Sequence, residues 1–180
     1  MISYAQNRED VVLMRIFGGE VAGFYVDVGA YDPVAHSVTK AFYDVGWRGI
    51  NIEPQPALCA RLEKERVRDV NLNIAMSDAE GAATLLVTKY RPLSTLDPSI
   101  VDGANADYAI MERLDVRTST LAVVMAKHAT AETIHFLKID VEGHEAAVLR
   151  GADFRRFRPI VIVVEAVCPT TAVPRWESWE

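Results

Sequence analysis

Ionisable side chains gather at one point of the sequence. The stretch FLKIDVEGHE, residues 136–145, opens with apolar residues and then places Asp140, Glu142, His144 and Glu145 within six positions. A carboxylate or a neutral imidazole can take a proton from a reacting group, so Asp140, Glu142 and His144 are candidate general bases. The alternative for Glu142 and Glu145 is structural, because acids in the first turn of a helix oppose its dipole.

A divalent cation is the chemical rival to proton transfer. Asp140, Glu142 and Glu165, together with the His144 imidazole, offer the oxygen and nitrogen ligands that Mg²⁺ or Mn²⁺ accepts. Such an ion would lower the pKa of a reacting hydroxyl. Gly143 interrupts the strand, so that alternate residues need not converge on one ion. We therefore expect a site without a metal and keep Mg²⁺ as the alternative.

Composition narrows the possible partners. The chain has 180 residues, 50% hydrophobic and 24% charged, which predicts a single domain over residues 1–180. A net charge of −6 without a basic run argues against nucleic acid as a partner. Apolar runs such as IVIVV, residues 160–164, are too short to span a membrane, and the charged N-terminus does not resemble a signal peptide. We expect a cytoplasmic protein.

Apolar periodicity predicts strands that alternate with helices. Ser3 is the expected N-cap of the first helix, and Gly46 is the expected end of the second. The stretch VNLNIAM is expected to form one strand, and AATLLV with the turn before it suggests an added hairpin. The expected strands are 23–29, 49–54, 70–76, 82–87, 135–141 and 159–165, with a further short strand at the start of RLDVRTSTLAVVMAKHA, residues 113–129. The expected helices are 5–17, 36–46, 55–67, 118–129 and 144–151.

This alternation predicts the fold class. Strands that read as nearly continuous apolar runs between helices belong to a parallel sheet covered on both faces. The fold class is therefore α/β, with a doubly wound, mostly parallel sheet and helices on both faces. Such sheets bind ligands at the carboxyl ends of their strands, beside the point where the strand order reverses. Asp27, Glu53, Asp140 and Glu165 lie near four strand ends and are expected to face one crevice.

The connection from Thr88 to Met111 shows little periodicity and contains Pro92, Pro98 and Gly103. A connection of that length is usually functional or disordered. We expect it to form a mobile lid that contributes to the choice of substrate.

The turn after the first strand indicates the kind of ligand. The sequence VDVGAYDP has one glycine, Gly29, where a dinucleotide site would have G-x-G-x-x-G to admit a pyrophosphate. S-adenosylmethionine has a ribose and no phosphate, so one tight turn and an acid are chemically sufficient. Glu53, at the end of the second strand, could accept hydrogen bonds from both ribose hydroxyls, and Asp27 could serve the amino-acid end.

Several blocks in order resemble the FkbM-type methyltransferase family. They are SYAQNREDVVL, GFYVDVGAYDPVAHSVTKAFYDVGWRGINIEP, LKIDVEGHEAAVLRG and RPIVIVVEA, and they cover nearly the whole chain. The resemblance implies a class I, Rossmann-like methyltransferase that uses S-adenosylmethionine. It also implies O-methylation of a hydroxyl on a sugar, a surface-glycan intermediate or a polyketide. The variants HSVT, GWRG and FRP look most like members found with bacterial polysaccharide biosynthesis.

The resemblance also implies roles by matching position. The turn after the first strand would bind the cofactor, Glu53 the ribose, and the residues after the third strand would flank the adenine. Asp140 ranks first as the base because it is expected nearest the methyl group. The cofactor-binding residues expected on these grounds are Asp27, Gly29, Ala30, Tyr31, Asp32, Glu53, Pro54, Ala75, Met76 and Ser77.

Family members continue past a segment like WESWE into a final β-hairpin, whereas this sequence stops at Glu180. We therefore expect a domain truncated at its C-terminus, with a sheet that lacks this hairpin. Two other functions stay open: a module that binds S-adenosylmethionine without turnover, and an NAD-dependent dehydrogenase of similar fold. A homodimer is a further possibility, beside a small-molecule or glycan acceptor as partner.

Overall fold

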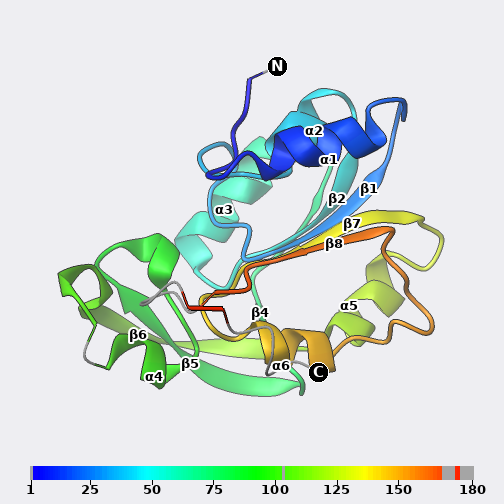
Figure 1. Ribbon diagram of the computed structural model, residues 1–180. Coiled ribbons are helices and arrows are strands. Elements are labelled where there is room, and N and C mark those ends of the chain that lie inside the picture. Colours follow the sequence, from blue (N-terminus) through cyan, green and yellow to red (C-terminus); the bar gives the residue numbers. More distant parts are fainter. Residues whose placement is uncertain (1, 103, 168–172, 175–180) are drawn as a thin grey trace.

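A five-stranded parallel sheet forms the centre of the protein (Figure 1). This computed structural model describes residues 2–102, 104–167 and 173–174. The strands pair in the order β3-β2-β1-β7-β8, and each neighbouring pair is parallel. The strand order therefore reverses between β1 and β7. The strands are β1 (Phe24–Val28), β2 (Arg48–Ile52), β3 (Val70–Leu72), β7 (Ile134–Ile139) and β8 (Val161–Val164).

Helices cover both faces of this sheet, as the sequence predicts (Figure 1). One face carries α1 (Glu9–Phe17), α2 (Lys40–Asp44) and α3 (Pro56–Glu65), and the other carries α5 (Leu121–His128) and α6 (Glu145–Arg150). Alternate residues of the strands feed two separate cores. Tyr25 and Phe136 pack with α1 and α2, whereas Val26, Leu137 and Ile139 pack with α5 and α6. The doubly wound α/β fold is confirmed.

A second, three-stranded sheet adjoins the first. It contains β4 (Ala75–Met76), β5 (Gly81–Thr88) and β6 (Ile110–Ser119), in the order β4-β6-β5. The prediction of one strand over residues 70–76 is therefore wrong, because β3 and β4 belong to different sheets. Asn73 separates them: its side-chain amide donates to the carbonyls of Glu53 and Pro54, both at 2.9 Å, and the chain leaves the first sheet there.

The connection between β5 and β6 contains short helical segments where the sequence predicts none. They are η1 (Arg91–Leu93), α4 (Pro98–Val101) and η2 (Ala106–Tyr108). Thr95, which is fully buried, exchanges two backbone hydrogen bonds with Leu86 of β5, at 2.9 and 3.2 Å. The first part of the connection is therefore fixed to the sheet.

The first helix is shorter than predicted. It begins at Glu9, after Arg8 in a left-handed conformation with φ of 65°, so Ser3 is not its N-cap. The hydroxyl of Ser3 instead donates to the buried carboxylate of Asp10 at 2.7 Å. Asp10 also accepts the backbone N–H of Tyr4 at 2.7 Å. We call residues 3–8, which run from this anchor to the helix, the N-terminal strap.

The second helix is also shorter than predicted, because it begins at Lys40 and not near His36. A buried polar network replaces the expected first turns. Arg66, at the end of α3, donates to the carbonyl of Pro33 at 3.0 Å and to the hydroxyl of Thr39 at 2.9 Å. Its other contacts are Asp69, at 3.1 Å, and the Tyr25 hydroxyl, at 2.8 Å. The guanidinium of Arg66 thus fixes the loop after β1 through these hydrogen bonds.

Among the described residues, no helix is long and apolar enough to cross a membrane. The WESWE segment, which bears on the expected absence of a C-terminal hairpin, lies outside the part of the chain that the structure describes.

Candidate active site

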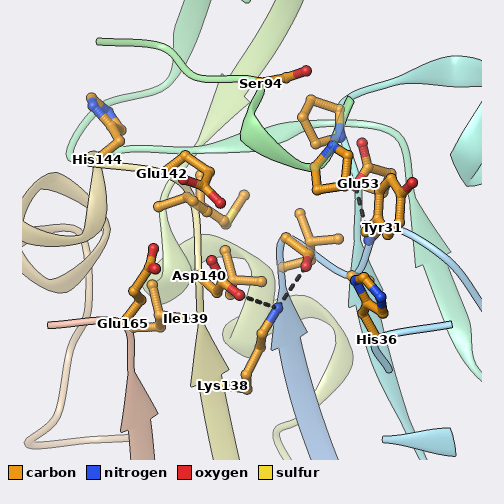
Figure 2. A pocket seen from close by; sticks show the side chains of 18 of the residues that line it. Tyr31, His36, Glu53, Ser94, Lys138, Ile139, Asp140, Glu142, His144 and Glu165 are labelled. Atoms are coloured by element: carbon orange, nitrogen blue, oxygen red, sulfur yellow. Dashed lines mark hydrogen bonds and ion pairs between the residues drawn. The ribbon is translucent and has the colours of Figure 1, made fainter. Parts of the chain in front are cut away.

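A cavity of about 500 Å³ opens at the carboxyl ends of the parallel strands (Figure 2). Its walls come from the turn after β1 and from the ends of β2, β7 and β8. Residues 74–76, Leu85, residues 90–94 and Leu96 close a second side, and Gln6, Asn7 and Glu9 of the N-terminal region close a third. The cavity therefore lies where the strand order reverses, which is the position that the fold predicts for a ligand.

The turn after β1 is bonded closely to its neighbours. The N–H groups of Gly29 and Ala30 both donate to the Ile52 carbonyl, at 3.0 and 3.1 Å. Gly29 has a φ of 76°, and a Cβ there would lie 1.9 Å from the carbonyl oxygen of Asp140. Glycine is therefore required on both counts, by the left-handed backbone and by the close approach of β7.

Glu53 continues this bonding pattern from the end of β2. One of its carboxylate oxygens accepts the N–H of Tyr31 at 3.0 Å, and the other accepts the N–H of Gln55 at 2.8 Å. Burial raises the pKa of Glu53 to about 7, although these two hydrogen bonds act against the shift. Each oxygen keeps a second lone pair, so the carboxylate is held in one orientation at the cavity wall and can still accept hydrogen bonds.

Lys138 joins the two central strands at the floor of the site. It lies opposite Asp27 in the register of β1 and β7, so their side chains share a face. Its Nζ lies 3.6 Å from the carboxylate of Asp140 (Figure 2). The same Nζ donates to the carbonyl of Gly29 at 2.7 Å and lies 3.3 Å from Asp27. Burial alone would lower the pKa of Lys138, but the carboxylates of Asp27 and Asp140 raise it above its usual range. Lys138 is therefore cationic at neutral pH.

Three carboxyl groups converge beside this lysine. One oxygen from each of Asp140, Glu142 and Glu165 lies within 4.8 Å of the others, which is the set that the sequence singles out for a divalent cation. Burial, reinforced by neighbouring carboxylates, raises the pKa of Glu142 to about 9 and that of Glu165 to about 8. Glu142 is thus protonated at neutral pH, and the raised pKa of Glu165 favours its protonated form as well, which reduces the repulsion within the group.

Asp140 differs from its two neighbours. Its side chain is 43% exposed, lies toward Lys138 and lines the cavity. The second carboxylate oxygens of Glu142 and Glu165 are instead buried, with no hydrogen-bond partner among the described residues. The cluster therefore combines one accessible, lysine-paired carboxylate with two carboxyls that can donate a proton in a hydrogen bond.

His144 and Glu145 begin the last helix of the site. Burial lowers the pKa of His144, whose Nε2 lies 3.0 Å from the hydroxyl of Ser77, so this imidazole is neutral at pH 7. Glu145 is buried and accepts the N–H groups of Val141 and Gly143, at 3.0 and 3.1 Å. Glu145 therefore has the structural role that the sequence offered as its alternative.

Most of the predicted site residues line this one cavity. The exceptions are Asp27, which is buried beneath it and paired with Lys138, and Ser77, which is bonded to His144. Asp32 is the third, because its carboxylate accepts the N–H groups of Val34 and Ala35, both at 2.9 Å. Those that line the cavity are Gly29, Ala30, Tyr31, Glu53, Pro54, Ala75, Met76, Asp140, Glu142, His144 and Glu165.

Sequence reasoning missed several wall residues. Arg91 lines the cavity and donates to the side chain of Gln55 at 3.0 Å. The buried Thr95 lies behind the wall and donates to the carbonyl of Glu142 at 2.7 Å. Both lie in the aperiodic connection, where no pattern ranks one residue above another. Gln6 and Asn7 were missed because they were assigned to a helix.

A parallel sheet wound on both faces, with its cavity at the reversal of strand order, defines a Rossmann-like α/β protein. The chain belongs to the FkbM methyltransferase family, because the family model described as "Methyltransferase FkbM domain" matches residues 27–172. It is therefore a methyltransferase. Neither the curated proteins nor the solved structures that were compared gave a match.

Proposed function

We propose that this protein is an S-adenosylmethionine-dependent O-methyltransferase whose acceptor is a hydroxyl of a sugar, a surface-glycan intermediate or a polyketide. The observation that carries the proposal is the turn after β1, which meets Glu53 at the wall of the cavity. The family implies the donor, and we infer from the site that the residues present fit it.

The backbone of this turn argues for a donor without phosphates. The N–H groups of Gly29, Ala30 and Tyr31 are all used within the protein, by Ile52 and Glu53. A pyrophosphate needs free backbone N–H groups at a helix N-terminus, and here the next helix begins only at Lys40. The dehydrogenase alternative is therefore disfavoured.

The rest of the cavity fits a nucleoside. Its volume, about 500 Å³, lies within the ~300–1,000 Å³ typical of small-molecule sites. Glu53 provides a fixed carboxylate for the ribose hydroxyls, and the neighbouring wall is apolar, which suits a purine ring. The apolar lining residues near Glu53 are Pro54, Ile74, Ala75, Met76, Pro92 and Leu93.

The three carboxyl groups of Asp140, Glu142 and Glu165 would then bind and activate the acceptor. When bound, S-adenosylmethionine supplies a methyl group on a positively charged sulfur. Asp140 is the proposed base that takes the proton of the acceptor hydroxyl, because it is accessible and Lys138 holds it at the cavity. Glu142, protonated at neutral pH, donates a hydrogen bond to the acceptor, and the neutral His144 offers a second polar contact.

Calorimetry with S-adenosylmethionine and S-adenosylhomocysteine tests the proposal. Glu53→Ala should weaken binding of both by roughly 1.5–3 kcal/mol, the range for hydrogen bonds to a charged acceptor. Glu63→Ala, an exposed substitution on α3, is the matched control and should bind as the wild type does. Unchanged affinity in Glu53→Ala would remove Glu53 from the ribose role.

A module that binds the donor without turnover is the remaining alternative. It predicts normal calorimetry but no transfer of radioactive methyl to any member of a panel of hydroxylated sugars and glycan intermediates. Transfer to one of them, with a product stable to mild base as an ether is, would establish O-methylation.

A further inference from the structure

Hydrogen bonds fix the N-terminal strap to the rest of the protein. Besides Ser3 and Tyr4, the carboxylate of Asp10 accepts the N–H groups of Ala5, at 3.4 Å, and Val11, at 2.8 Å. The Tyr4 hydroxyl donates to Asp44 at 3.2 Å, and Lys40 lies over the Tyr4 ring. The strap is therefore fixed to both helices that it adjoins, α1 and α2.

The strap presents two amides to the cavity. Gln6 and Asn7 both line it, and both are exposed. The Asn7 side chain donates to Glu9 at 3.2 Å, whereas the Gln6 side chain has no hydrogen-bond partner among the described residues. An amide NH₂ carries two donors, so each side chain keeps donor capacity for a ligand.

The position of the strap indicates which end of the donor it would meet. Glu53 marks the ribose at the end of β2, and the cavity continues from there across β1 toward Lys138. The strap shares the sheet face of α1 and α2, and the nearby cavity wall includes His36 and Val38 from the loop after β1 (Figure 1). The amino-acid end of the donor would extend in this direction from the ribose.

The α-carboxylate of the donor needs hydrogen-bond donors there, and the obvious cation is already occupied. Lys138 is shared among Gly29, Asp27 and Asp140. The N–H groups of the turn are likewise occupied by Ile52 and Glu53. Among the described residues, the side-chain amides on the strap and the imidazole of His36 are donors that remain on this side of the cavity, and the strap supplies the larger number of N–H groups.

We propose that the N-terminal strap recognises the amino-acid end of the methyl donor, with the side-chain amides of Gln6 and Asn7 as hydrogen-bond donors to its α-carboxylate. This assignment rests on the proposed function. It adds residues that the family match does not include, because that match begins at residue 27.

Two nucleosides test the assignment by calorimetry on the full chain. S-adenosylhomocysteine carries the amino-acid end, and 5′-methylthioadenosine lacks it while keeping the adenine and ribose. The double variant Gln6→Ala, Asn7→Ala should lose about tenfold or more in affinity for S-adenosylhomocysteine. It should change by less than about twofold for 5′-methylthioadenosine, whose contacts are all elsewhere.

Arg15→Ala, an exposed change on α1 outside the cavity wall, is the control and should affect neither ligand. Equal weakening of both nucleosides in the double variant would indicate a loosened site and overturn the assignment, as would unchanged affinity for S-adenosylhomocysteine. A wild-type protein that binds neither nucleoside would defeat the proposed function itself, and with it this inference. Glu53→Ala differs from the strap variant because it should weaken both nucleosides.

Discussion

Asp140 and Glu142 are two positions apart but meet different surroundings. Lys138 lies beside the exposed carboxylate of Asp140, whereas burial near other carboxylates raises the pKa of Glu142 to about 9. Two carboxyl groups whose environments differ in this way can take opposite roles, one as proton acceptor and one as hydrogen-bond donor. The residues of the cluster are therefore separable by substitution.

Asp140→Asn removes a proton acceptor while it keeps the shape of the side chain. If Asp140 is the base, turnover should fall by about 10²–10⁴, with the affinity for S-adenosylmethionine nearly unchanged. Steady-state kinetics beside calorimetry make the comparison. A cation held by the cluster would instead show itself in the wild type, as loss of activity with a chelator and recovery with Mg²⁺ or Mn²⁺. Full turnover by Asp140→Asn would contradict both the role of Asp140 as the base and its role as a metal ligand.

Glu142 should make the stability of the protein depend on pH. Its pKa is raised from 4.5 to about 9 in the folded state. Between these values the folded protein binds a proton that the unfolded chain has released, so the free energy of unfolding falls as the pH rises. Glu142→Gln should flatten this decline and raise Tm at pH 9 by about 2–4 °C.

Thermal melts from pH 5 to pH 9 check the effect of Glu142→Gln. Glu80→Gln, on an exposed turn, is the matched control and should leave the pH dependence unchanged. Parallel curves for wild type and Glu142→Gln would contradict the raised pKa.

The sequence predicted the acids of the site because they follow apolar strands, and strand ends share one edge of a parallel sheet. It could not predict that Lys138 bonds the carbonyl of Gly29, since that contact depends on the register of β1 against β7. Nor could it separate Asp32, a turn residue, from the cavity wall, because both roles favour an acid after the strand.

Among the elements, the connection from β5 to β6 has two unlike parts. Thr95 is buried, paired with Leu86 and bonded to the carbonyl of Glu142. Of the described residues in the outer part, 98–102 and 104–109, most are exposed or partly exposed, and Ile100 and Tyr108 are buried. The predicted lid therefore has an inner part bonded to β5 and to Glu142, and an outer part whose backbone hydrogen bonds close mainly local turns.

Amide hydrogen exchange should separate these two parts. We expect protection at Leu86 and Thr95, whose N–H groups bond each other's carbonyls across the sheet. We expect faster exchange at Ser99, Asp107 and Ala109, whose N–H groups bond acceptors only two or three residues away in local turns. Thr95→Val keeps the volume of the side chain but removes its hydroxyl, so exchange at residues 94–97 should speed up. Uniform protection from Thr88 to Met111 in the wild type would contradict the lid.

Element boundaries were predicted least well where side chains compete with regular structure. Residues 70–76 are apolar enough for one strand, but the amide of Asn73 bonds two carbonyls and diverts the chain into the second sheet. In the same way, Asp10 accepts hydrogen bonds from Ser3 and Tyr4 and so fixes the N-terminal strap, of which residues 5–8 were predicted to be helical. Helix α3, which has no such competitor and has Pro56 at its start, matches the prediction closely.

Across the whole molecule, a buried network links the core to the site. Asp69 accepts hydrogen bonds from Tyr25, Gly49, Asn51 and Arg66. Arg66 reaches Thr39, which in turn donates to Asp27 at 3.1 Å, beside Lys138. The positions of Asp27 and Lys138 at the floor of the cavity therefore depend on the buried ion pair between Arg66 and Asp69.

Removing one member of this pair should destabilise the whole fold. The side chains of Arg66 and Asp69 are 1% and 0% exposed, so Arg66→Met leaves an uncompensated buried carboxylate. We expect a loss of about 3–5 kcal/mol in the free energy of unfolding, measured by urea denaturation. Arg155→Met, at an exposed position, should cost less than about 0.5 kcal/mol. A small effect in Arg66→Met would show that the network rearranges.

The close contact between Gly29 and the carbonyl of Asp140 also limits which amino acids position 29 can hold. A library randomised at position 29 should yield no active clone with any other residue, because every side chain would meet a backbone oxygen that cannot move aside. Gly46 has a similar backbone, with φ of 102°, but nothing lies within 4 Å of its missing Cβ. Asparagine tolerates such a backbone and should survive there. Two glycines that both have a positive φ would thus differ in how many residue types the fold accepts in their place.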